Sequence, residues 1–302
     1  MSNSTIDPIL FELQNKISIS MMIIYSFFCL TGNPLVIYIM TRPYFLKISI
    51  FRFSATASFI SILRLLGWIA NAYRDYIGVN SSVFTCKVFY YVVYLPHDVA
   101  SWIMVWTGID RYLSVKYPKK FAFRNKTKFQ VLIILIIISL NLLNNIQILF
   151  VFDFVSNACQ VVDFKLAIFS VIETGFLSTA LPGFLMIIIS CMIYKRLIDN
   201  KKKIGANQKK EITLFKTLIS VYTLYLICYL PYYISYVIYC FLGTNFESTI
   251  TWQITQYLCA FYSAFDYFIY FFSNRIFREH SLKLFGLSRC IPKTKGKTGR
   301  IS

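Results

Sequence analysis

The chain has 302 residues, of which 57% are hydrophobic and only 15% are charged. A soluble domain carries roughly 25% charged residues, so the composition argues against an ordinary soluble protein and favours a membrane protein. Lys and Arg outnumber Asp and Glu by 31 to 13, for a net charge of +18. Such a charge also suits nucleic acid, so its placement along the chain has to decide the partner.

Seven apolar stretches follow one another, and each has the about 20 residues that a membrane-spanning helix needs. They are Ile17–Met40, Ile48–Ala72, Val83–Val115, Val131–Phe152, Leu166–Tyr194, Leu214–Leu242 and Ile250–Phe272. Helices are expected because lipid offers no partner to an open backbone group. The sequence therefore predicts an all-α membrane protein, a seven-transmembrane helix bundle at residues 17–273.

The basic residues set the orientation of this bundle. Most of the 31 Lys and Arg residues lie on one side, in connectors 42–47, 116–128 and 195–210 and in the tail from Arg275. Because positive segments stay in the cytoplasm, we expect an extracellular N-terminus and a cytoplasmic C-terminus in the plasma membrane. The positive charge of the inner face favours the lipid bilayer and cytoplasmic proteins as partners. We expect no binding of nucleic acid.

The two ends of the chain differ from the bundle. Residues 1–16 are expected to form an extracellular N-terminus. Residues 274–287 combine Ile276, Phe277, Leu284 and Phe285 with flanking basic residues, which predicts a short amphipathic eighth helix on the inner leaflet. Residues 288–302 are expected to be a disordered cytoplasmic tail.

The extracellular side carries features of an oxidising compartment. Cys86 and Cys159 are the two of the eight cysteines that fall near outer aqueous loops, so we expect a disulfide between them. Sequons at Asn3 and Asn80 predict glycosylation. The connector around Cys159 is expected to form short strands, as a hairpin lid.

Signs of catalysis are lacking in the sequence. The only histidines are His97 and His280, and there is no phosphate-binding or dinucleotide motif. We therefore expect no enzyme activity, no cofactor and no metal.

A set of motifs, in order and each on its expected span, resembles the rhodopsin-like (class A) G protein-coupled receptors over essentially the whole chain. The motifs are Asn33 in "TGNPLVIY", Cys86 and Cys159, "DRYLSVKYP", Pro182, "CYLP" at Cys228–Pro231 and "DYFIY" at Asp266–Tyr270. The resemblance implies that an extracellular ligand activates a heterotrimeric G protein, with arrestin as a further partner.

The resemblance also assigns a cytoplasmic switch, which comprises Asp110, Arg111, Tyr112 and Glu211. In the family, the arginine is held by its neighbouring acid and by an acid at the base of the sixth span. Release of these contacts lets the sixth span swing outward and opens a crevice for the G protein. The other reading of these charges is a surface salt bridge of little energetic value.

An activation relay is expected between the ligand and this switch. The resemblance places it at Cys228, Tyr229, Pro231, Asp266 and Tyr270, with the proline kink as the pivot of the sixth span.

The chain departs from the family pattern at several relay positions. Tyr229 replaces the usual tryptophan, and Tyr267 replaces the usual proline of the seventh span. The second span lacks the sodium-binding Asp, with Ser58 or Ser61 nearest to it. The relay is therefore expected to be a variant.

Ionisable and aromatic residues deep in the spans mark a candidate ligand pocket. Arg64 and Asp98 either pair with each other or line the pocket together with His97. The remaining candidates are Glu173, Tyr232, Tyr236 and Gln256, with Trp252 nearby. The outer rim is acidic, which suits a basic or amidated peptide, as in the neuropeptide-type receptors.

The alternative to a G protein-coupled receptor is a membrane transporter or ligand-gated channel, or a seven-span binding protein without G protein coupling.

Overall fold

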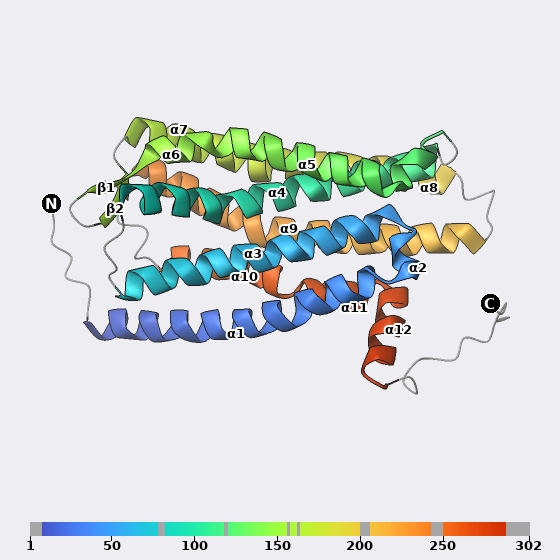
Figure 1. Cartoon of the computed structure of the whole chain (residues 1–302), viewed down its shortest axis with the longest axis horizontal. Coiled ribbons are helices and arrows are strands. Elements are labelled where there is room, and N and C mark those ends of the chain that lie inside the picture. The colour runs from blue at the N-terminus through green and yellow to red at the C-terminus, as the bar shows by residue number, and fades with distance from the viewer. Residues whose placement is uncertain are drawn as a thin grey trace.

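The computed structural model describes residues 8–77, 82–117, 120–155, 158–161, 164–199, 206–242 and 250–287. Long helices run side by side along the molecule and form one bundle (Figure 1). A two-stranded hairpin lies at one end, and helix α12 lies across the other end.

The elements follow the apolar stretches of the sequence. The helices are α1 (Pro8–Met40), α2 (Pro43–Leu46), α3 (Ser49–Ile77), α4 (Val83–Lys116), α5 (Thr127–Asn144), α6 (Ile148–Val151), α7 (Phe164–Gly175), α8 (Leu181–Asp199), α9 (Ala206–Leu242), α10 (Ile250–Ala264), α11 (Asp266–Ser273) and α12 (Arg275–Leu284). The 3-10 turns η1 (Ala122–Asn125) and η2 (Asn145–Gln147), the π-helical turn η3 (Phe176–Ala180), and strands β1 (Phe152–Val155) and β2 (Ala158–Val161) complete the described chain.

Six helices of the described residues are long and apolar enough to cross a membrane. The seventh predicted span is divided into α10 and α11 at Phe265, whose backbone leaves the helical region (φ −103°, ψ 11°). Together α10 and α11 cover the expected range, so the seven-span architecture is confirmed. The fifth span is also interrupted, because the π-helical turn at Phe176–Ala180 precedes α8.

The expected hairpin is confirmed. β1 and β2 pair in antiparallel register, with Phe154 opposite Cys159. β1 packs on the start of α4, where Cys86 is fully buried and disulfide-bonded. The side chain of Cys159 lies outside the described part of the structure, so the pairing of these two cysteines stays a prediction.

Helix α12 is anchored to the bundle by its first turn. The Asn274 side chain caps it by accepting a hydrogen bond from the backbone N–H of Phe277 (3.1 Å). Phe277 is fully buried against Tyr267 and Tyr270, and Tyr267 is hydrogen-bonded to Ser281. Phe277, expected on the inner leaflet, therefore packs into the bundle instead.

Asn33 joins the first helix to the seventh span. Its side chain is fully buried, and its Nδ2 donates to the carbonyl oxygen of Ser263 in α10 (2.9 Å) and to the Cys29 sulfur (3.1 Å). Next to it, Gly32 allows a close approach, since a Cβ there would lie 3.0 Å from Cβ of Tyr267. This polar contact fixes α1 against α10 inside an otherwise apolar interface.

Replacing Asn33 by Ala should lower the melting temperature of the purified protein in nanodiscs. The loss should correspond to about 1–3 kcal/mol, because the Ser263 carbonyl would lose a buried donor. The control is Thr31→Val on the same helix, where the exposed hydroxyl bonds only to its own helix. An Asn33→Ala melting temperature equal to that of the control would contradict this role.

Candidate functional site

A cavity of about 150 Å³ lies in the half of the bundle that carries the hairpin. Helices α1, α3, α4, α9 and α10 each contribute to its wall. The polar and aromatic lining residues are Cys29, Arg64, Trp68, Tyr90, Tyr94, His97, Tyr229, Tyr232, Tyr233, Gln256, Cys259 and Ser263. Such a concave, mainly aromatic wall with few polar groups is typical of a small-ligand site.

Aromatic stacking organises the side of the cavity between α4 and α9. The ring of His97 stacks on Tyr229, with centroids 4.6 Å apart, and on Tyr233 at 5.8 Å. The His97 Nε2 lies 3.5 Å from the Thr179 hydroxyl of the π-helical turn. His97 of α4 is thus held by two further elements, α9 and η3.

Arg64 brings a positive charge into the cavity. Its guanidinium carbon lies 4.9 Å from the centroid of the Tyr229 ring, within the range of a cation–π contact. Its Nη1 donates to the Ser263 hydroxyl over 3.4 Å.

Four of the predicted pocket residues, Arg64, His97, Tyr232 and Gln256, line the cavity together. Asp98 does not. It is fully buried against η2, where its Oδ2 accepts a hydrogen bond from Asn145 Nδ2 (2.6 Å). Within the described part of the structure Asp98 forms no ion pair with Arg64 and does not line the cavity, so neither expectation for Asp98 is met. A neutral amide at the end of the fourth span binds its Oδ2 instead.

The other pocket candidates lie elsewhere. Glu173 is half-buried on α7 and is not part of the cavity wall. The side chains of Tyr236 and Trp252 lie outside the described part of the structure, as do Asn3 and Asn80.

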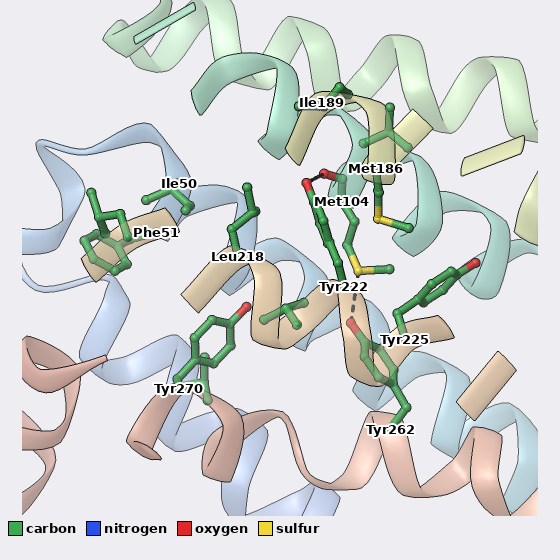
Figure 2. Packing of buried hydrophobic residues seen from close by; sticks show 14 of the residues in the cluster. Ile50, Phe51, Met104, Met186, Ile189, Leu218, Tyr222, Tyr225, Tyr262 and Tyr270 are labelled. Carbon is green, nitrogen blue, oxygen red and sulfur yellow. Dashed lines mark hydrogen bonds between the residues drawn. The ribbon is translucent and has the colours of Figure 1, made fainter. Parts of the chain in front are cut away.

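Tyrosines of α9 continue from the cavity toward the opposite end of the bundle. Tyr225 stacks on Tyr229 (4.7 Å), and Tyr262 of α10 meets both rings edge-on. One turn further, the Tyr222 hydroxyl donates to the carbonyl oxygen of Met104 (2.7 Å), whose sulfur accepts from Tyr262 (3.0 Å). Figure 2 shows Met104 of α4, Tyr222 and Tyr225 of α9, and Tyr262 of α10 meeting in the core.

The predicted relay residues surround this tyrosine cluster. Cys228 and Tyr229 are buried, and Tyr270 packs with them in one hydrophobic core. Pro231 lies within α9, between these residues and Tyr233. Asp266 is buried and accepts a hydrogen bond from the Ser61 hydroxyl (3.2 Å), which links α11 to α3.

The predicted switch residues Asp110, Arg111 and Tyr112 lie at the last turns of α4. Asp110 and Arg111 are both buried, with Asp110 Oδ2 3.9 Å from Arg111 Nε. Arg111 Nη2 donates to the Ser114 hydroxyl (2.9 Å). Tyr112 is half-buried, and the Lys116 amine lies 5.2 Å from its ring centroid. The Glu211 side chain lies outside the described part of the structure.

Asp110 has two further partners. Arg124 of η1 brings its Nε to 3.3 Å from Asp110 Oδ1, a shorter separation than that of Arg111. The Ser49 hydroxyl, at the first residue of α3, donates to Asp110 Oδ2. Since Asp110 is only 2% exposed, solvent screens these contacts little, which excludes the reading of a surface salt bridge.

A family profile described as "7 transmembrane receptor (rhodopsin family)" matches residues 32–270. The chain belongs to the rhodopsin family of seven-transmembrane receptors. This rhodopsin-family receptor is also similar to galanin receptor 2b of Danio rerio. The two are 24% identical over 283 residues, which cover 88% of this chain and 68% of the fish receptor.

Membership of this family decides the class of function. The chain is a multi-pass membrane receptor that couples an extracellular ligand to a heterotrimeric G protein, and it is not an enzyme. Nothing in these comparisons favours a transporter or a channel.

The sequence motifs did not reveal two contacts of Asp110, those with Arg124 and Ser49. Arg124 lies in the connector after α4, and Ser49 is the first residue of α3. Neither belongs to the sequence motif around Asp110, so the motif could not predict these contacts. The one sequence signal for a second cation near Asp110 is the clustering of basic residues at this end of the bundle.

Replacing Arg124 by Gln should lower the receptor's basal nucleotide exchange on a purified G protein. Asp110 would then have Arg111 as its remaining described guanidinium partner, so the resting contact would strengthen. A shift of about 1 kcal/mol in the resting equilibrium corresponds to roughly fivefold.

Asp110→Asn removes the charge that both guanidinium groups share, and it should raise basal exchange. The control is Lys126→Gln, which removes an exposed charge from the same connector. A rise in basal exchange for Arg124→Gln would show that Arg124 supports the resting state instead of competing with Arg111.

Proposed function

We propose that this receptor is activated by a peptide whose end enters the cavity between α3, α4, α9 and α10. The similarity to a galanin receptor, a peptide receptor, supports this class of ligand. The cavity volume also supports it. At about 150 Å³ the cavity is smaller than the 300–1,000 Å³ of typical small-molecule pockets, so it suits one end of a longer ligand.

The observation that carries the proposal is the unbroken side-chain path from this cavity toward the switch. His97 and Arg64 touch Tyr229 at the cavity floor. Tyr229 packs on Tyr225 and Tyr262. These tyrosines and Tyr222 contact α4 above its Asp110–Arg111 end, at Ser101 and Met104.

In our proposed mechanism, the ligand changes the packing around Tyr229, and α9 pivots at Pro231. Pro231 lacks the backbone N–H that would stiffen the helix there. Outward movement of α9 breaks the Tyr222–Met104 hydrogen bond and separates α9 from the end of α4. Arg111 then separates from its resting partners, among which we propose Glu211 as the distant acid. The space opened in this way admits the G protein.

We further propose the placement of the receptor in the membrane and its remaining partners. The hairpin end faces the outside with Cys86 bonded to Cys159, and the α12 end faces the cytoplasm. Arrestin and the inner lipid leaflet meet this basic end. Glycans at Asn3 and Asn80 belong to the outer side.

Peptide-stimulated nucleotide exchange in membranes with purified G proteins tests this function. A peptide that stimulates exchange on the unmodified receptor should fail to do so on Arg111→Ala, because the arginine that we propose engages the G protein would be absent. Surface expression should stay within about twofold, and peptide binding should persist. Lys126→Gln serves as the charge control.

Two outcomes would contradict the proposal. Exchange by Arg111→Ala at the level of the unmodified receptor would remove the switch from the mechanism. Peptide binding without exchange on any G protein would favour a seven-span binding protein that does not couple.

A further inference from the structure

The ligand cavity contains a fixed positive charge and, among the residues that the structure describes, no carboxylate in its wall. The only charged side chain of the lining is Arg64, and the other polar members are tyrosines, His97, Gln256, Ser263 and cysteines. We propose that Arg64 binds a carboxylate of the ligand, so that the receptor recognises a peptide by an acidic end held inside the bundle. This inference rests on the proposed function and adds the chemical class of the buried end.

Arg64 has donors to spare for such a partner. A guanidinium has five N–H donors, and the described contacts engage two neutral partners, the Ser263 hydroxyl at 3.4 Å and the Cys259 thiol. The cation–π contact with Tyr229 positions the group without using its edge donors. Because a charged side chain inside a membrane span is costly, a cation whose partners among the described residues are all neutral indicates a functional partner.

The internal acids that lie nearest along the spans are engaged elsewhere. Asp98 accepts a hydrogen bond from Asn145 on the side of η2. Asp266 accepts from Ser61 on the side of α3. Among the described residues neither forms an ion pair with Arg64, so the cavity keeps a net positive charge for the ligand to neutralise.

The surroundings of Arg64 favour a planar carboxylate next to an aromatic group. Arg matches a carboxylate with two parallel hydrogen bonds, one to each oxygen. A neutral amide has one acceptor oxygen and an ammonium group has none, so neither can accept this pair of bonds. Tyr229, Tyr232 and Trp68 supply apolar faces around it. The carboxylate can belong to the peptide C-terminus or to an acidic side chain near that end.

This inference differs from the sequence-based expectation of a basic or amidated peptide. That expectation came from acids on the outer rim. Among these, Asp153 lies 3.5 Å from the Lys87 amine, so it is already paired. The rim and the cavity therefore contact different parts of a ligand, and the part that enters the cavity meets a cation.

Three short probes separate the sources of the carboxylate on the intact receptor in phosphatidylcholine nanodiscs. Acetyl-Gly-Phe carries a terminal carboxylate, acetyl-Gly-Phe-amide carries none, and acetyl-Asp-Phe-amide carries one on a side chain. Binding is measured by thermal stabilisation at up to about 10 mM, since fragments of this size bind weakly. This readout needs no G protein, so it stays informative even if the proposed signalling function fails.

We expect at least one of the two acids to bind about tenfold more tightly than the amide, because a charge-assisted hydrogen bond replaces a neutral one. Preference for acetyl-Gly-Phe assigns the C-terminus, and preference for acetyl-Asp-Phe-amide assigns a side chain. Equal binding of all three probes, or no binding of any, overturns the proposal.

Variants of the receptor give the second arm. Arg64→Gln should abolish the preference for acids, Arg64→Lys should retain part of it, and Lys87→Gln should leave it unchanged, because Lys87 is a cation outside the cavity wall. Loss of the preference in Lys87→Gln but not in Arg64→Gln would move the anion site to the rim and overturn the assignment. If Arg64→Gln does not fold, the comparison of acid and amide on the unmodified receptor still decides.

Discussion

Polar side chains inside the bundle need partners within the protein, because lipid offers them none. This constraint explains which contacts hold the helices in register. Asn33 bonds to the Ser263 carbonyl, Ser61 to Asp266, and Asn145 to Asp98, and each bond joins two different spans. Apolar packing brings the helices together, while these few bonds select one arrangement, since a shift of either helix would leave a buried group unsatisfied.

The same constraint makes α4 the reference element of the receptor. Its first turns carry the disulfide-bonded Cys86 beneath the hairpin, its middle carries His97 and Asp98, and its last turns carry Asp110. One continuous helix holds all of these positions. The cavity wall and the Asp110 end of α4 are therefore connected through the backbone of the same helix. In the mechanism that we propose, the helix that moves is α9, whose tyrosines contact α4 at Ser101 and Met104.

The departures from the family pattern have structural consequences that fit together. Tyr229 replaces tryptophan and stacks with both His97 and Tyr225. Tyr267 replaces proline and reaches Ser281 of α12, while α11 begins after a break at Phe265. The seventh span therefore keeps a break near the usual place, although no proline is present to cause it. The region in which we propose the relay is therefore built from tyrosines, whose rings stack on one another and whose hydroxyl groups bond to α4.

The sequence by itself determined the spans, the hairpin, the place of the DRY triplet and the family, because these depend on local hydropathy and on motifs of fixed spacing. It also placed Arg64, His97, Tyr232 and Gln256 together, since their depths along the spans are similar. Only the tertiary structure decided that Asp98 turns to Asn145, that Arg124 and Ser49 share Asp110, and that Phe277 enters the core. Depth in the membrane follows from counting residues along one helix, whereas the direction of a side chain depends on how that helix is rotated against its neighbours. That rotation is set by contacts between residues far apart in the chain, which no single stretch of sequence contains.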